Sequence, residues 1–77
     1  MKDLHYFELV QAEIDRAERL YPAWPPNIFE QMAVVNEEAG EATRAVLHYK
    51  RENGSLQDVK TELIQTCAVC IRMLKEL

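Results

Sequence analysis

The sequence predicts an all-α domain of three helices, two of which pair as a long helical hairpin. Apolar residues recur every three or four positions in three separate stretches, which is the period of an amphipathic helix. Between these stretches lie two short segments rich in helix-stopping residues, Tyr21–Asn27 with three prolines and Asn53–Ser55 with a glycine. The chain has 77 residues, so we expect residues 1–77 to form a single small domain.

The first helix is predicted from about residue 3 to residue 20 or 21. Its apolar positions step by three and four along the chain: Phe7, Val10, Ile14, Ala17 and Tyr21. The prolines that follow lack a backbone N–H and restrict the residue before them, so they end this helix.

The second helix is predicted from about residue 28 to residue 52. Asn27 suits the N-cap, and Glu30 suits the reciprocal position of a capping box. Asn53-Gly54 supplies a left-handed residue that ends the helix. Its apolar stripe predicts a seam packed against another, nearly parallel or antiparallel, helix: Ile28, Met32, Val35, Ala39, Ala42, Val46 and Tyr49.

The third helix is predicted from about residue 56 to residue 76, with Ser55 as its N-cap and Asp58 in its first turn. Its main stripe is Val59, Leu63, Thr66, Cys70, Leu74 and Leu77. A second apolar flank widens this face beyond what one partner helix would cover, and therefore predicts a subunit interface: Ile64, Cys67 and Ile71.

Cys67 and Cys70 lie at i, i+3 in this pattern. They could form a redox pair or half of a zinc site, but we expect reduced cysteines packed in the core. His5 and His48 are isolated histidines, and we assign them no special role.

Composition narrows the class of protein. The net charge of −4 argues against nucleic acid or an anionic membrane as a partner. No apolar run is long enough to span a bilayer, and the N-terminus lacks the apolar core of a signal peptide, so we expect a soluble, cytoplasmic protein. A core of this size is marginal without a metal or oligomerisation.

Acidic residues recur with matching phase on the two long helices. Glu38 and Glu41 lie about 60° and 120° to one side of the second helix's stripe, and Glu62 and Gln65 lie at the same angles on the third. Three carboxylates and an amide oxygen facing one gap suit Mg²⁺, which prefers oxygen ligands. The alternative is a solvated charged face, which is common on helices. Glu37 lies further toward solvent.

The segments Glu37-Glu38-Ala39-Gly40-Glu41 and Glu62-Leu63-Ile64-Gln65 resemble the E-E-x-x-E and E-x-x-D pattern of MazG-like nucleotide pyrophosphohydrolases. The resemblance spans roughly residues 20–76 and is greatest to small single-domain members. It implies Mg²⁺-dependent cleavage of nucleoside triphosphates to a monophosphate and pyrophosphate, with Mn²⁺ as an alternative ion. It also implies a homodimer or homotetramer whose paired helices build a four-helix-bundle core.

By this resemblance, Glu38, Glu41 and Glu62 are metal ligands, and Gln65 stands where the family has aspartate. Glu37 would lie behind the ligands or orient water. By the same resemblance, we expect Glu37 and Glu38 to be the catalytic residues. Gln65 carries no charge and cannot accept a proton, which keeps open a catalytically silent module that binds a nucleotide or a protein. A plain helical oligomerisation domain is the third alternative.

Substrate contacts are predicted at three further residues. Arg72 lies seven residues beyond Gln65 on the same helix flank, and Lys50 ends the second helix. Trp24 could stack on a base or anchor the proline-rich connection.

Overall fold

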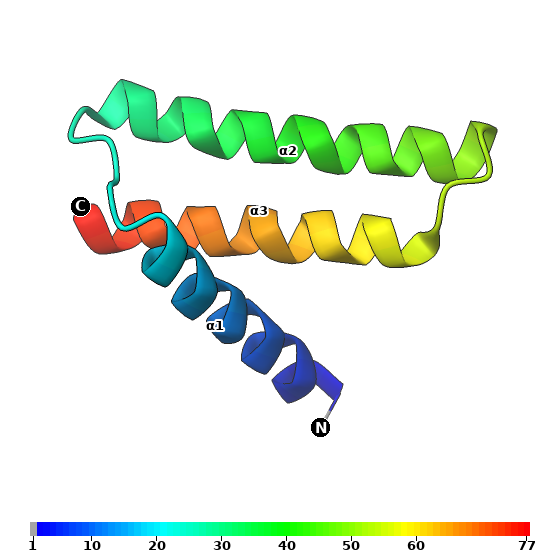
Figure 1. The fold of residues 1–77 in the computed structure, drawn as a ribbon, viewed down its shortest axis with the longest axis horizontal. Helices are drawn as coiled ribbons and strands as arrows, with labels where there is room; N and C mark the ends of the chain where they lie inside the picture. Colours follow the sequence, from blue (N-terminus) through cyan, green and yellow to red (C-terminus); the bar gives the residue numbers. More distant parts are fainter. Residues whose placement is uncertain (1) are drawn as a thin grey trace.

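The computed structural model describes the backbone of residues 2–77 and the side chains of residues 3–77. It contains three helices, α1 (Lys2–Leu20), α2 (Ile28–Arg51) and α3 (Leu56–Glu76), and no strand within residues 2–77. α2 and α3 run antiparallel as a long hairpin, whereas α1 crosses α3 obliquely and diverges from the hairpin toward its N-terminus (Figure 1). The predicted all-α class, helix order and helix bounds are confirmed.

The helix ends form largely as the sequence predicts. Asn27 Oδ1 accepts hydrogen bonds from the backbone N–H groups of Phe29, at 2.7 Å, and Glu30, at 3.4 Å. Ser55 Oγ accepts one from the N–H of Asp58 at 3.0 Å. These side chains satisfy N–H groups that have no partner inside their own helix.

Asn53 and Gly54 contribute to the α2–α3 turn in different ways. Asn53 has the left-handed backbone, with φ of 59°, and Gly54 does not. Gly54 instead passes so close to the end of α2 that a Cβ at this position would lie 2.9 Å from the carbonyl carbon of His48. Its N–H donates to the His48 carbonyl at 2.8 Å, which closes the turn against the last residues of α2.

The predicted apolar stripe of α2 is mostly wrong as the seam of the hairpin. Only Ala42 of that stripe is buried and Val35 half-buried, while the other five members are exposed: Ile28, Met32, Ala39, Val46 and Tyr49. The hairpin seam retains Ala42 and otherwise runs along buried Gln31 and half-buried Val34, Glu38 and Ala45. The large apolar side chains of the stripe therefore face away from α3 in the single chain.

α3 departs from its predicted stripe in the same way. Its buried residues are Ala68, Val69 and Arg72, and its predicted core cysteines, Cys67 and Cys70, are both exposed. The expectation of core cysteines is therefore wrong for this chain by itself. Val59 and Thr66 of the predicted stripe are half-buried, whereas its remaining apolar members are exposed: Leu63, Leu74 and Leu77.

α1 contributes its middle and C-terminal part to the core. Ile14 and Ala17 are buried, as the sequence predicts, and Val10 is half-buried. Phe7 and Tyr21, at the two ends of the predicted stripe, are exposed. α1 packs against α3 and not against α2 over the described residues, so only one side of α1 is covered.

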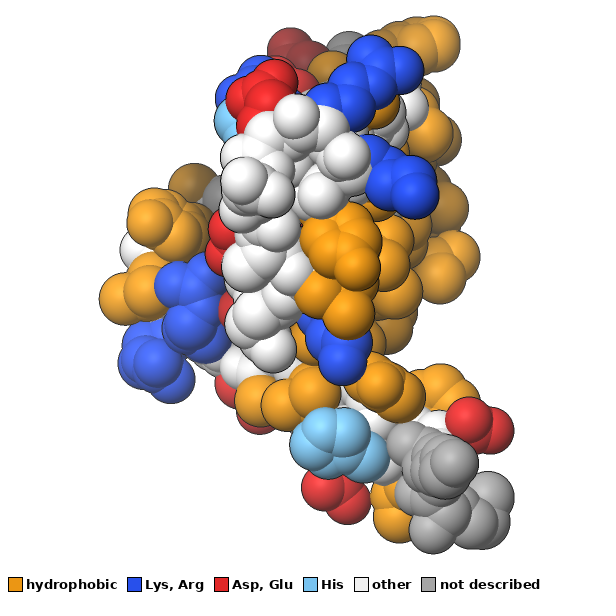
Figure 2. Space-filling view, turned by 90° about the vertical axis from the view of Figure 1, so that its right-hand side faces the viewer, with side chains coloured by type: hydrophobic (Ala, Val, Ile, Leu, Met, Phe, Trp, Pro, Cys, Tyr) orange, Lys and Arg blue, Asp and Glu red, His pale blue; other side chains and the backbone are white. Residues whose placement is uncertain are grey.

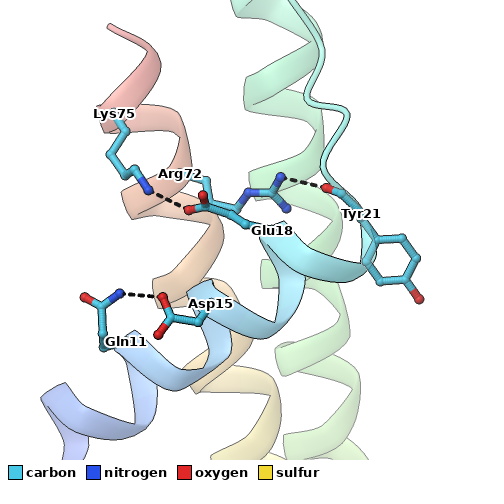
Figure 3. Close-up of polar contacts among 6 residues, drawn as sticks. All are labelled: Gln11, Asp15, Glu18, Tyr21, Arg72 and Lys75. Atoms are coloured by element: carbon cyan, nitrogen blue, oxygen red, sulfur yellow. Dashed lines mark hydrogen bonds and ion pairs between the residues drawn. The ribbon is translucent and has the colours of Figure 1, made fainter.

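Arg72 joins the proline-rich connection to α3. Its side chain is 9% exposed, its Nη2 donates to the carbonyl of Tyr21 at 2.9 Å, and its guanidinium lies over the Trp24 ring, 4.6 Å from the centroid. One turn further, Lys75 bonds Glu18 of α1 (Figure 3). These contacts fix the position of the proline-rich connection between α1 and α2, beside the part of the hairpin that carries the acidic residues.

Much apolar surface remains uncovered. Figure 2 shows hydrophobic side chains in contiguous areas at the surface, beside groups of charged residues. None of the helices in the described range is long and apolar enough to cross a membrane.

Candidate metal centre

Three carboxylates converge at the middle of the hairpin. Glu38 and Glu41 lie one turn apart on α2, and the antiparallel α3 places Glu62 opposite them. One carboxylate oxygen from each residue lies within 4.8 Å of the corresponding oxygens of the other two. The predicted grouping of these three glutamates is therefore present in the structure.

The triad, defined here as Glu38, Glu41 and Glu62, is partly removed from water. Glu38 and Glu62 are half-buried and Glu41 is exposed. The Oε2 atoms of Glu38 and Glu62 are each buried without a hydrogen-bond partner in the described part of the chain. Buried polar atoms are normally paired, because an unpaired one loses its hydration without compensation.

Burial and mutual repulsion disfavour the charged forms of two triad members. Desolvation, followed by the negative charges of Glu41 and Glu62, raises the pKa of Glu38 above its ordinary value. Desolvation and then the charge of Glu41 raise the pKa of Glu62. Glu13 of α1 and Glu37 add smaller repulsions that also raise the pKa of Glu38. The site therefore concentrates negative charge that a bound cation would relieve.

This donor set fits a hard divalent cation. Carboxylate oxygens are the ligands that Mg²⁺ and Ca²⁺ prefer, and Mg²⁺ commonly retains waters beside one or two carboxylates. The two buried, unpartnered oxygens are available as ligand atoms. Acidic clusters also occur on helices that bind no ion, so the fit rests on these oxygens rather than on the number of glutamates.

Gln65 lies beside the triad on the side of the proline-rich connection. It is half-buried and lines, together with Glu38, a cavity of about 280 Å³. Trp24, Arg16 and Arg72 line the same cavity, with apolar residues of all three helices. The structure thus places Gln65, Trp24 and Arg72 around one cavity with Glu38, and their predicted roles stay predictions.

Two predicted residues lie away from that cavity. Glu37 is exposed on α2 next to Glu38, and it is close enough to influence the titration of Glu38. Lys50 is exposed in the last turn of α2, at the end of the hairpin opposite the proline-rich connection.

A second cavity, of about 260 Å³, adjoins the triad on the side of the α2–α3 turn. Besides Glu41 and Glu62, it is lined by Arg44, His48 and Asp58, together with Ala45 and Gly54. Sequence reasoning did not assign these three polar residues to the site. Helical spacing could have identified them, because Asp58 precedes Glu62 by four residues and Arg44 and His48 follow Glu41 by three and seven.

The fold and site define an all-α protein in which an antiparallel helix pair carries a partly buried acidic triad between two cavities. The chain matches no protein-family model, no curated protein and no solved structure. The resemblance to MazG-like enzymes therefore stays a prediction that rests on the residues themselves.

Proposed function

We propose that this protein is a Mg²⁺-dependent nucleoside triphosphate pyrophosphohydrolase, which converts an NTP or dNTP to the monophosphate and pyrophosphate. The observation that carries the proposal is the triad, with two buried carboxylate oxygens that lack a partner. Desolvation and then repulsion between the carboxylates raise the pKa values of Glu38 and Glu62, and a cation at this place would compensate that repulsion.

In this proposal Glu38, Glu41 and Glu62 hold the ion, and the amide oxygen of Gln65 takes the place of a fourth oxygen donor. The bound ion would offset charge on the phosphate oxygens and lower the pKa of a bound water. Glu37 is exposed beside the triad, where its carboxylate could orient the attacking water. Glu38 would be one of the residues that hold the ion, with its buried Oε2 as a possible ligand atom.

The cavity beside Gln65 supports the proposed substrate contacts. The apolar walls and the Trp24 ring suit the flat face of a nucleobase. Arg72 lines the same cavity and would add positive charge, although its Nη2 is bonded to Tyr21 and its guanidinium faces Trp24. Lys50, further along α2, would meet only a part of the substrate that extends toward the α2–α3 turn.

We also propose a homodimer or homotetramer with a four-helix-bundle core. Large apolar side chains on the outward faces of α2 and α3 support it, because they are exposed in the single chain: Met32, Val46, Leu47, Leu63, Ile71 and Leu74. Exposed apolar area of this kind is typical of protein–protein interfaces.

A catalytically silent nucleotide-binding module is the second candidate. Gln65 favours it, because a half-buried amide replaces a carboxylate at the edge of the triad. An amide oxygen can ligate Mg²⁺ but contributes no negative charge and accepts no proton.

Pyrophosphate release from a panel of NTPs and dNTPs, with Mg²⁺ or Mn²⁺, tests the enzyme. We expect metal-dependent turnover that Glu38→Gln abolishes while circular dichroism shows intact helices. Glu30→Gln, at an exposed position in the first turn of α2, is the matched control and should retain turnover. Folded wild-type protein that binds nucleotide but releases no pyrophosphate would favour the silent module.

A further inference from the structure

The cavity on the α2–α3 turn side of the triad differs in character from its neighbour. The cavity beside Gln65 has largely apolar walls, whereas the turn-side cavity is lined mainly by ionisable residues. Glu41 and Glu62 of the triad form part of its wall. A ligand group here would therefore be polar and would share the proposed ion with the triad.

Arg44 is the cation best placed to meet an anionic group in this cavity. It is exposed and lies one turn beyond Glu41, about 4.5 Å further along the helix axis. Its guanidinium has no ion pair or hydrogen bond to another side chain among the described residues. An arginine in this state can offer a planar fork of donors to phosphate oxygens.

The arginines of the other cavity are already occupied. Arg16 donates to both carboxylate oxygens of Glu13, at 2.9 and 2.8 Å. Arg72 is buried, bonded to the Tyr21 carbonyl and stacked on Trp24. Both guanidinium groups therefore already have protein partners, whereas the Arg44 guanidinium has no side-chain partner among the described residues.

The remaining charges of the turn-side cavity indicate which form of the anion it accepts. His48 lies one further turn along α2, and its Nδ1 is 3.4 Å from Glu52 Oε2. Asp58 of α3 adds a negative charge to those of Glu41 and Glu62. A free polyphosphate would be repelled by the three carboxylates, so the cavity suits a polyphosphate already paired with a divalent cation.

We propose that the turn-side cavity binds the diphosphate part of the substrate, as its magnesium complex, with Arg44 contacting the phosphate oxygens. The inference rests on the proposed function and adds the direction of the substrate along the hairpin. The nucleoside lies toward Trp24, the α-phosphate beside the triad, and the β- and γ-phosphates toward Arg44 and His48.

This direction matches where charge develops in the reaction. The oxygen of water forms a bond to the α-phosphorus as the bond from that phosphorus to the bridging oxygen breaks. The electron pair of the broken bond stays with the diphosphate, and the proton of the water passes to a neighbouring carboxylate and then to solvent. Arg44 would thus stand beside the leaving group, where positive charge stabilises the transition state.

Titration calorimetry with magnesium pyrophosphate tests the inference without requiring turnover. We expect Arg44→Ala to raise the dissociation constant by about tenfold or more, since a charge-assisted pair is lost. Arg44→Lys should restore part of the affinity, because it keeps the charge and loses the fork. Lys60→Ala is the control: it also removes one exposed positive charge near the start of α3, but Lys60 does not line this cavity.

The outcomes separate this inference from the proposed function. Equal pyrophosphate affinity in wild type and Arg44→Ala, or no binding by wild type, would overturn the inference even if wild type hydrolyses NTPs. If wild type turns over, Arg44→Ala should also weaken inhibition by added pyrophosphate. Arg44-dependent pyrophosphate binding without any turnover would support the cavity assignment and contradict the enzyme.

Discussion

Glu38 and Glu62 each bury one carboxylate oxygen, Oε2, for which the described residues provide no hydrogen-bond partner. A cation is the simplest partner for such atoms, and packing between α2 and α3 is what brings them together. The folded protein without metal therefore carries an electrostatic penalty at neutral pH, and this penalty has measurable consequences.

The metal-free protein should lose stability as the pH rises from the acidic range toward neutrality, as far as these two groups are concerned. Their pKa values are raised in the folded state above the ordinary value of 4.5, so the folded state holds protons that the unfolded state has released. Stability therefore falls as the pH rises through the interval between the unfolded and folded pKa values. Melting temperatures recorded over a range of pH in the presence of a chelator measure this dependence of stability on pH.

Glu38→Gln isolates the contribution of one of these groups. It should raise the melting temperature of the metal-free protein at neutral pH and flatten the pH profile, because the amide carries no charge to bury. Glu30→Gln, at an exposed position, should leave the profile unchanged. A Glu38→Gln profile that overlays that of wild type would show that the buried oxygen costs nothing.

Mg²⁺ should offset the loss of stability that the metal-free protein shows as the pH rises toward neutrality. We expect it to raise the melting temperature of wild type at neutral pH and to do so less in acid, because protonated carboxylates do not ligate metal. Gln65→Asp should tighten Mg²⁺ binding if residue 65 contacts the ion, and unchanged affinity would remove it from the site. The absence of any Mg²⁺ effect on wild type would count against the metal centre itself.

Arg72 shows that a predicted substrate residue can have a structural role. Arg72→Ala should destabilise the fold by about 2 kcal/mol, since a hydrogen bond to a carbonyl and a stacked cation are both lost. Arg51→Ala, at an exposed position, should change the free energy of unfolding by less than about 0.5 kcal/mol. Urea unfolding measures both; an unaffected Arg72→Ala variant would mean that these contacts contribute nothing to stability.

At the scale of the helices, replacing each of the two glycines of the chain by alanine should have opposite effects on stability. Gly54→Ala should destabilise the hairpin by about 1–3 kcal/mol, because the new Cβ meets backbone and Cβ atoms of His48 at 2.9 Å. Gly40→Ala should stabilise α2 by about 0.5–1 kcal/mol, because nothing lies within 4 Å and alanine favours a helix interior.

Urea unfolding of both alanine variants tests this contrast. Equal changes in the free energy of unfolding for Gly54→Ala and Gly40→Ala would mean that the turn accommodates the new Cβ without strain. A loss of stability in Gly40→Ala would indicate that the Gly40 surface is covered in solution, since the single chain leaves it open.

At the scale of the whole molecule, the three helices leave many large apolar side chains exposed. α1 covers α3 along only part of its own length, and the outward faces of α2 and α3 remain open. Small domains bury a limited fraction of their surface and are correspondingly marginal. Association is the direct way to cover the remainder.

Light scattering should therefore find a dimer or tetramer. Leu63→Glu, at an exposed leucine of α3, should shift the mass toward the monomer by introducing a charge into the proposed interface. Thr61→Glu, an exposed polar position on the same helix, is the control and should not. A folded wild-type monomer would contradict the proposed assembly.

Helix positions were predictable because their signals are local. Caps at Asn27 and Ser55, the prolines after Tyr21 and the turn at Asn53 act within a few residues, so they determine the helix ends whatever surrounds them. The grouping of Glu38, Glu41 and Glu62 was also predictable, since helical spacing and a hairpin suffice to bring them together.

The packed faces were not predictable in the same way. The longest apolar stripe of α2 predicts the hairpin seam, but Gln31 and Glu38 lie there in place of most of its members, and only Ala42 of the stripe is buried. Periodicity reports which face of a helix is apolar and not which partner covers it. In a chain that leaves much apolar surface exposed, the most apolar face need not be the one that packs internally.

The sequence by itself thus determined three helices, their ends and the acidic residues that share a phase, because each depends on contacts between neighbours in the chain. Only the tertiary structure decided that Glu38 and Glu62 bury an oxygen, that Arg72 is occupied by Tyr21 and Trp24, and that Arg44 stands free beside the triad. The physical reason is that burial and pairing depend on how the helices rotate about their axes, and that rotation is set by packing between segments distant in sequence.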